Sequence, residues 1–267
     1  MHASNSTFSN MFEFRREDPW TAQVYLLTSP WPVICICSAY LLFVYRIGPR
    51  FMQNRKPYNL KNVILIYNIC QMIYNATMFL LIFYYIFIVN VYDKSCMETL
   101  KLDSPIKSVE RWISYAFFIN KIFDLLDTIF FVLRKSYKQI TVLHVYHHAM
   151  MVFCMYWVIR MYGVGGQYST MGLCNSLVHF TMYFYYFVSG LRPEMKASLW
   201  WKKYITITQI IQFMIYLVQS IIVLLYNPSC QFPLFMQWQQ IFQSTVMIVM
   251  FSNFYYKAYV KPKKRTE

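Results

Sequence analysis

Three of the chain's five histidines, His144, His147 and His148, lie within a stretch of five residues. Side chains at positions i, i+3 and i+4 of a helix share one face, so the three imidazoles would form one cluster if this stretch is helical. The residues around them are mostly apolar. The sequence therefore predicts an imidazole cluster within a hydrophobic helix.

Other apolar stretches carry polar side chains at helical spacing. They are Lys121, Asp124 and Asp127; Asn175, His179 and Tyr183; and Gln209 and Gln212. Ionisable groups in a membrane helix cost a few kcal/mol each and usually face a partner or a cavity. Counted from the expected helix ends, a common depth of roughly 6–17 Å holds for Asp124, Asp127, His144, His147, His179, Gln209 and Gln212. A shared depth favours one site over separate interhelical hydrogen bonds.

Three kinds of chemistry are open to such a site. Histidine and aspartate can bind zinc or iron, although the membrane di-iron enzymes use more histidines than the five in this chain. Histidine and aspartate also form proton pathways in transporters. The third possibility is acyl chemistry, in which an imidazole acts as nucleophile or base beside an orienting carboxylate or amide.

The composition is that of a membrane protein. Apolar residues make up 58% of the 267 residues and charged residues only 13%, and the apolar residues come in blocks close to the length of a bilayer crossing. We expect an all-α, polytopic membrane protein formed by residues 1–267 as one domain. The expected spans are 28–45, 63–90, 113–133, 140–160, 169–189, 204–226 and 235–256.

Basic residues alternate between the loops and predict the orientation. The loops after the first, third and fifth expected spans and the C-terminal tail are rich in Lys and Arg, whereas segment 91–112 has four residues of each sign and segments 161–168 and 227–234 have no charge. The positive-inside rule then places the N-terminus in the lumen and the C-terminus in the cytosol. The formal net charge of +14 is consistent with this bias and also with a basic entrance for a phosphate-bearing substrate.

Four ordered motifs resemble those of one enzyme family. They are Lys121-Ile-Phe-Asp124-Leu-Leu-Asp127-Thr128, His144-Val-Tyr-His147-His148, the segment from Asn175 through His179 to Tyr186, and Thr206-Ile-Thr-Gln209-Ile-Ile-Gln212. Their order and spacing resemble the very-long-chain fatty acid elongases, the 3-oxoacyl-CoA synthases of the endoplasmic reticulum, over about residues 20–260. Asp124 departs from the pattern, which usually has Glu at this position.

The resemblance implies a fold and a reaction. The fold would be a bundle of seven transmembrane helices, six of which enclose a closed tunnel for the acyl chain. The reaction would join long-chain acyl-CoA and malonyl-CoA, with release of CoA and CO2, and would need no metal or cofactor. Expected partners are membrane lipid, the reductases and dehydratase of the elongation cycle and a second copy of the chain, with no nucleic acid.

The resemblance also implies roles for single residues. His147 would accept the acyl group as an acyl-imidazole, with His179 nearby, and a direct condensation with His147 as base is the alternative. His144, His148 and Asp127 would orient and tune the cluster. Hydrogen bonds and substrate contacts would come from Lys121, Asp124, Asn175, Tyr183, Gln209 and Gln212, and the CoA phosphates would meet Arg134, Lys135, Lys202 and Lys203.

The seven cysteines divide by position. Cys96 and Cys230 fall in expected lumenal loops, and the other five fall within expected spans. The lumen of the endoplasmic reticulum permits disulfides. We therefore expect a Cys96–Cys230 disulfide that joins two lumenal loops.

Overall fold

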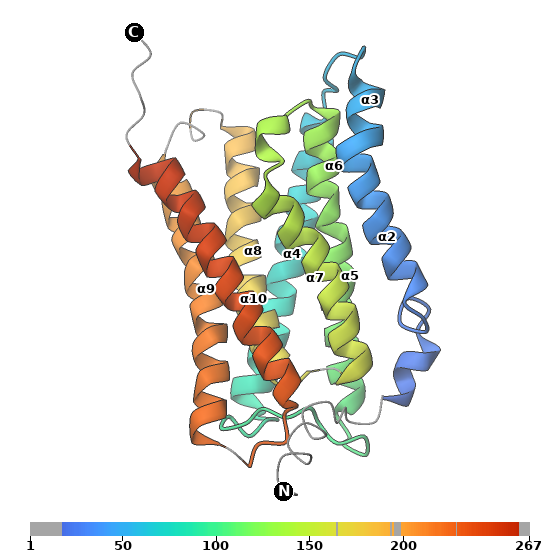
Figure 1. Ribbon diagram of the computed structural model, residues 1–267, viewed down its shortest axis with the longest axis vertical. Helices are drawn as coiled ribbons and strands as arrows, with labels where there is room; N and C mark the ends of the chain where they lie inside the picture. The colour runs from blue at the N-terminus through green and yellow to red at the C-terminus, as the bar shows by residue number, and fades with distance from the viewer. Residues whose placement is uncertain (1–17, 164, 193, 195–198, 228, 262–267) are drawn as a thin grey trace, which may run out of the picture.

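Seven helical rods run side by side in a computed structural model that describes residues 18–163, 165–192, 194, 199–227 and 229–261 (Figure 1). The rods are Trp31–Met52 (α2 Trp31–Leu42, a π-helical segment and α3 Gly48–Met52), Lys61–Ile88 (α4 Lys61–Phe83 and a π-helical segment), α5 Lys107–Phe123 with α6 Leu125–Leu133, α7 Val142–Met161, α8 Tyr168–Leu191, α9 Leu199–Tyr226, and α10 Leu234–Tyr255 with a π-helical segment to Val260. The described residues contain no strand. The all-helical class predicted from the sequence is confirmed.

Several expected span boundaries differ from the ends of the rods, two of them by six residues or more. The first rod does not end at 45 but continues to Met52, because Pro49 falls in the first turn of α3, where a missing N–H is tolerated. The third rod begins at Lys107 rather than at 113. Four of the rods, Trp31–Met52, Lys61–Ile88, α7 and Trp200–Tyr226, are long and apolar enough to cross a membrane by length and composition.

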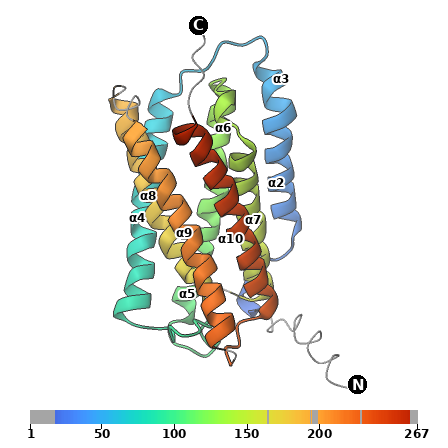
Figure 2. The ribbon, with the colours of Figure 1, turned by 60° about the vertical axis from the view of Figure 1, so that its left-hand side comes forward.

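Six of the rods form a closed ring. Contacts pass from α4 to α8, α9, α10, α7 and α5, and from α5 back to α4. The rod of α2 and α3 lies outside this ring, where α2 packs against α7 and α3 against α6. Figure 2 shows this rod at the edge of the bundle. The ring is the arrangement that a central tunnel requires.

The antiparallel pair α4 and α8 packs closely because glycine stands at both ends of the contact. A Cβ on Gly172 would lie 3.0 Å from Cδ1 of Ile82, and a Cβ on Gly190 would lie 2.9 Å from Cδ2 of Leu65. Small residues let helix backbones approach in this way in membrane proteins. The close approach brings the polar side chains of α4 within reach of α8.

The loops alternate between the two ends of the bundle. Segments 53–60 and 134–141 lie at the end where the described chain finishes, and segments 89–106, 165–167 and 229–233 lie at the other end (Figure 1). The first will be called the basic end and the second the far end. Asn5 and the tail residues Lys263, Lys264 and Arg265 lie outside the described residues.

Cys96 and Cys230 form a disulfide at the far end, as expected from the sequence. Their Cα atoms are 5.4 Å apart, and 134 positions separate them in the chain. The Nε2 of Gln167 donates to the carbonyl oxygen of Cys96, and the backbone N–H of Gln231 donates to Oε1 of Glu98. The disulfide therefore ties the segment before α5 to the segment before α10.

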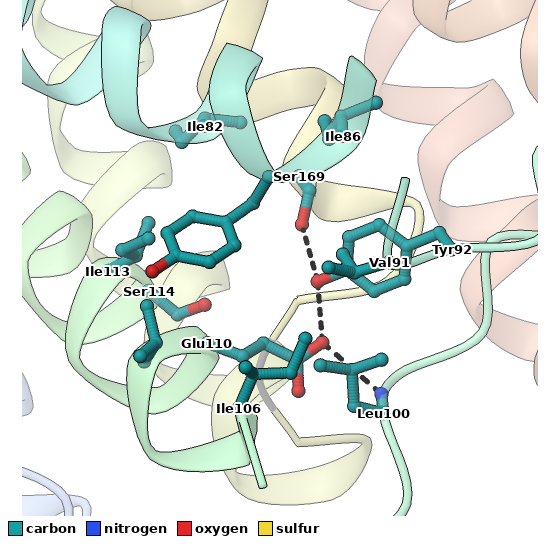
Figure 3. Close-up of a pocket in the computed structure, with 12 residues that line it drawn as sticks. Ile82, Ile86, Val91, Tyr92, Leu100, Ile106, Glu110, Ile113, Ser114 and Ser169 are labelled. Atoms are coloured by element: carbon teal, nitrogen blue, oxygen red, sulfur yellow. Dashed lines mark hydrogen bonds between the residues drawn. The ribbon is translucent and has the colours of Figure 1, made fainter. Parts of the chain in front are cut away.

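A buried polar network supports the same end of the bundle (Figure 3). Glu110 accepts hydrogen bonds from Tyr92 Oη at 2.6 Å and Lys107 Nζ at 2.6 Å, and Ser169 donates to Tyr92 Oη. Lys107 and Glu110 are both almost fully buried. Charge counting showed only that positive and negative residues balance in segment 91–112, whereas the structure shows that the Lys107–Glu110 pair is internal.

Candidate active site

A carboxylate cluster lies between α4, α5, α6 and α8. Lys121 Nζ lies 2.8 Å from Asp124 Oδ2 and also donates to Asn175 Oδ1 at 2.8 Å. Lys121, Asp124 and Asn175 are each at most 3% exposed. A buried ion pair needs further hydrogen bonds to offset the loss of hydration, and Asn175 supplies one for the ammonium group.

Tyr183 joins the two aspartates. Its hydroxyl lies 2.7 Å from Asp127 Oδ2 and 3.1 Å from Asp124 Oδ1. A phenol has one proton to donate, so it can serve only one carboxylate at a time. The shorter distance is the one to Asp127. The hydrogen-bond partner of Asp127 is thus a tyrosine and not a histidine of the expected cluster.

Helix α4 contributes two residues that sequence reasoning missed. Gln71 Nε2 donates to Asp124 Oδ1 at 3.0 Å, and Tyr67 Oη lies 3.3 Å from Tyr183 Oη. Tyr67, Gln71 and Asn75 recur every fourth residue in an apolar helix, and this stripe was the available signal. Asn75 extends it by accepting from Asn120 Nδ2 at 3.2 Å.

The break between α5 and α6 occurs at Asp124. The N–H of Asp127 donates to the carbonyl of Asp124, so the carbonyl of Phe123 has lost its usual partner in the helix. Tyr67 Oη donates to this oxygen at 3.1 Å. A non-helical carbonyl within a membrane needs such a partner, and Tyr67 thereby stabilises the turn that carries both aspartates.

The three histidines of α7 share one face, as predicted. The ring centroids of His144 and His148 are 4.4 Å apart, and those of His147 and His148 are 5.5 Å apart. Thr141 caps the helix by accepting a hydrogen bond from the N–H of His144. The imidazole cluster is therefore placed in the first two turns of α7, near the basic end.

Thr128 fixes the first of these rings. Its Oγ1 lies 2.8 Å from His144 Nε2 and 2.8 Å from Tyr40 Oη, which reaches in from α2 outside the ring of helices. Thr128 is fully buried and follows Asp127 directly. The histidine cluster and the carboxylate cluster are thus held by consecutive residues of α6.

Two fully buried imidazole nitrogens have no hydrogen-bond partner within the described part of the chain. They are Nδ1 of His147 and Nδ1 of His179. The second lies 3.4 Å from Asp124 Oδ2, close enough for an ion pair if the ring is protonated, but not in hydrogen-bonding geometry. The ring of His147 packs edge-on against Phe213 and Phe251. The hydrogen-bonding capacity of these two nitrogens is thus unused among the described residues.

The remaining expected residues lie apart from these contacts. Gln212 is buried and its Oε1 has no partner among the described residues, whereas Gln209 is partly exposed. Arg134 and Lys203 are exposed, Lys135 Nζ donates to the carbonyl of Gln53, and the carbonyl of Lys202 accepts from Thr206. The four basic residues lie near the basic end of the bundle.

Three cavities follow one another from the site toward the far end. The first is lined by residues of α7, α8, α9 and α10, including Asn175. It shares Met155, Val158 and Tyr168 with a second cavity. The second shares Ile82 and Ile113 with a third, which Figure 3 shows beside Glu110.

The fold and site define a helical membrane protein with imidazoles and carboxylates buried at one end and apolar cavities beyond them. Comparison with known proteins identifies the family. Residues 25–267 match the model of the ELO family, GNS1/SUR4. The chain therefore belongs to the ELO family.

Curated relatives agree over most of the chain. It is 41% identical to very long chain fatty acid elongase F of Drosophila simulans, over 90% of this chain and 92% of the relative. It is 33% identical to very long chain fatty acid elongase 4 of Mus musculus, over 99% of this chain and 85% of the relative. The family resemblance read from the four motifs is confirmed.

Proposed function

We propose that this protein is a 3-oxoacyl-CoA synthase that joins long-chain acyl-CoA to malonyl-CoA. The observation that carries the proposal is the buried, unpartnered imidazole of His147, whose ring packs against Phe213 in the wall of a methionine-rich cavity. Membership of a fatty acid elongase family supports the substrate class. A proton-coupled transporter would have no need of a long apolar cavity beyond its histidines.

The proposed first step forms an acyl-imidazole. A ring nitrogen of His147 attacks the thioester carbon, the C–S bond breaks, and the proton lost from the ring neutralises the CoA thiolate. Malonyl-CoA then loses CO2, and its enolate carbon attacks the acyl carbon. The N–C bond breaks, the ring takes up a proton, and 3-oxoacyl-CoA is released.

The carboxylate cluster would position the second histidine. His179 stands beside Asp124, which Lys121, Gln71 and Tyr183 hold in place. An enolate oxygen is stabilised by preorganised hydrogen-bond donors in a water-poor site. A His179 held in this way is suited to that task, and Asp127 would act through Tyr183 rather than on a histidine directly.

The proposal uses no metal. Among the described residues, one set of three potential metal ligands converges within 4.8 Å, formed by Cys96, Glu98 and Cys230. The sulfur atoms of Cys96 and Cys230 are bonded to each other in the disulfide. Inhibition by EDTA or phenanthroline that added metal reverses would overturn a metal-free mechanism.

We place the protein in the endoplasmic reticulum membrane with all seven rods crossing, the basic end in the cytosol and the far end in the lumen. The loop charges and the disulfide support this orientation. Acyl-CoA would then enter near Arg134, Lys135, Lys202 and Lys203. Protection of a C-terminal tag from protease in sealed microsomes would contradict it.

The decisive experiment supplies purified protein with acyl-CoA alone. The acyl-imidazole route releases one equivalent of CoA and adds the acyl mass to the His147 peptide, and added malonyl-CoA removes this mass as CO2 appears. His147→Ala and His179→Ala should each abolish condensation while the protein remains folded. Condensation without an acylated peptide would establish direct displacement with His147 as base, and no CoA release at all would refute the synthase.

A further inference from the structure

The rod of α2 and α3 lies outside the ring of helices, yet one of its side chains is connected to the histidine cluster. Tyr40 of α2 places its Oη 2.8 Å from Oγ1 of Thr128, and the same Oγ1 lies 2.8 Å from Nε2 of His144. Tyr40 is 5% exposed and Thr128 is fully buried. Side chains of α2, α6 and α7 thus form a chain of two short hydrogen bonds.

The number of protons fixes the direction of this chain. Each of the two hydroxyl groups carries one proton, and a buried O–H without an acceptor is costly. In the described part of the protein, Thr128 Oγ1 is the hydrogen-bond partner of Tyr40 Oη, so the proton of Tyr40 points to Thr128. The proton of Thr128 is then left with Nε2 of His144 as its acceptor.

The opposite direction leaves one proton unused. If Nε2 of His144 donated to Thr128, the hydroxyl of Thr128 would turn to Tyr40, and the phenol proton would have no acceptor among the described residues. Thr181 and Thr206 each donate to the backbone carbonyl four residues earlier, whereas the hydrogen-bond partners of Thr128 Oγ1 are Tyr40 and His144. One arrangement of the hydrogens therefore satisfies both hydroxyl groups.

We infer that Tyr40 is a positioning residue of the active site, which acts through Thr128 to hold His144 as the neutral tautomer with its proton on Nδ1. The inference rests on the proposed function, because it assigns roles within the same histidine cluster. It also gives α2 a part in the reaction, although this helix lies outside the ring.

This tautomer separates the roles of the histidines. The lone pair on Nε2 of His144 accepts the proton of Thr128, and the protonated Nδ1 has no lone pair to offer. His144 is then neither the nucleophile nor the base of the cluster, and it retains one N–H donor. His147 differs, because its Nδ1 has no partner among the described residues. The ring of His147 therefore keeps the unshared lone pair that acyl transfer requires.

The first test reads the tautomer directly. In the full chain with isotope-labelled histidine in lipid, nitrogen NMR distinguishes a protonated ring nitrogen from an unprotonated one, and the spectrum of His144→Gln identifies the signals of His144. The wild type should show Nδ1 protonated and Nε2 unprotonated. Tyr40→Phe should populate both tautomers, because Thr128 can then either donate or accept. A wild-type His144 with its proton on Nε2 would overturn the inference.

The second test measures condensation by the same proteins. Tyr40→Phe should lower kcat by about tenfold, the effect of one hydrogen bond, and should change KM for acyl-CoA little. Thr128→Val should lower kcat at least as much, and Thr128→Ser, which keeps the hydroxyl, should restore most of it. Tyr45→Phe is the matched control, since Tyr45 lies on the same rod and is 56% exposed. Its substitution should change neither kcat nor the spectrum.

A double variant tests the connection between the two residues. In Thr128→Val, the further change Tyr40→Phe should have no effect on kcat, because the route from Tyr40 to His144 is already lost. Fully additive effects would overturn the inference.

Thermal unfolding separates positioning from packing. A lower Tm for Tyr40→Phe with an unchanged tautomer and kcat would show that the phenol only holds α2 in place, and would overturn the inference. If the wild type condenses no acyl-CoA, the proposed synthase is refuted. The NMR comparison of wild type, Tyr40→Phe and Tyr45→Phe still decides in that case whether Tyr40 sets the tautomer of His144.

Discussion

Gln71 of α4 donates a hydrogen bond from Nε2 to Oδ1 of Asp124, 53 positions later in the chain, at 3.0 Å. The resemblance to the elongase motifs implies glutamate at this position, and this contact gives the shorter aspartate a donor. The short side chain of Asp124 is sufficient, because the side chains of Lys121, Gln71 and Tyr183 extend to its carboxylate from three helices. The bond joins α4 to the break in the third rod.

Replacing Gln71 with Leu should therefore weaken the fold. The substitution removes a donor from a buried carboxylate, and the expected loss is about 1–3 kcal/mol in the free energy of unfolding. Condensation should slow as well, because Asp124 also faces His179. Thermal unfolding in detergent and CoA release measure the two effects. Cys70→Ala, at an exposed neighbouring position, is the control and should change neither.

Lys121 and Asp124 should behave as a coupled pair. Lys121→Met leaves a buried carboxylate without its counter-charge, and we expect a loss of about 3–5 kcal/mol in stability. Adding Asp124→Asn should recover part of this loss, because the double variant buries no charge. A double-mutant cycle on unfolding free energies checks the coupling. Strictly additive losses would show that the ion pair does not act as a unit.

The Cys96–Cys230 disulfide should be measurable by chemistry and by stability. Alkylation without reduction should modify neither cysteine, as read by mass spectrometry. Cys230→Ser should lower stability, since the 134-residue separation corresponds to a contribution on the order of 4–5 kcal/mol in the chain-entropy account. Cys35→Ser, at an exposed free cysteine, is the control. Recovery of both thiols in alkylated form would rule the bond out.

The ion pair of Asp18 and Arg111 should make the far end sensitive to acid. Burial alone would raise the pKa of Asp18, but the hydrogen bonds and charge of Arg111 and the N–H of Trp20 bring the pKa below its usual value. The bond therefore contributes its full stability above about pH 4 and loses it as pH falls through the lowered pKa.

Thermal unfolding of the wild type between pH 7 and pH 3 should show this additional loss at the acid end. Asp18→Asn should be less stable at pH 7 and should lack that part of the pH dependence. Asp103→Asn serves as the comparison, since Asp103 is exposed and has no hydrogen bond or ion pair within the described part of the chain. Parallel pH profiles of the wild type and Asp18→Asn would contradict the assignment.

Periodicity and charge were enough to predict the helical class and the shared face of His144, His147 and His148. They also placed Asp124, Asp127, His147 and His179 in one layer, because a polar group in an apolar helix is conspicuous and helix geometry converts position into depth. The disulfide followed from the same topology, since only two cysteines fell in loops on one side.

The contributions of Tyr67 and Gln71 could not be read in the same way. Tyrosine and glutamine are common enough in membrane helices that a stripe of them indicates a polar face without naming its partner. The break at Asp124 was missed for a related reason. No Pro or Gly marks it, and the Tyr67 hydroxyl that stabilises it comes from another helix. Such partners are set by tertiary packing, which sequence spacing does not encode.

The polar stripe of α4 has a consequence for biosynthesis. Asn75 and Gln71 find their partners Asn120 and Asp124 on a rod that the ribosome completes 45 to 53 residues later. Until then α4 leaves the translocon with amides that lipid cannot satisfy. We expect nascent chains truncated before residue 120 to be held by the insertion machinery or taken by quality control. Those that extend through α6 should be released into the bilayer.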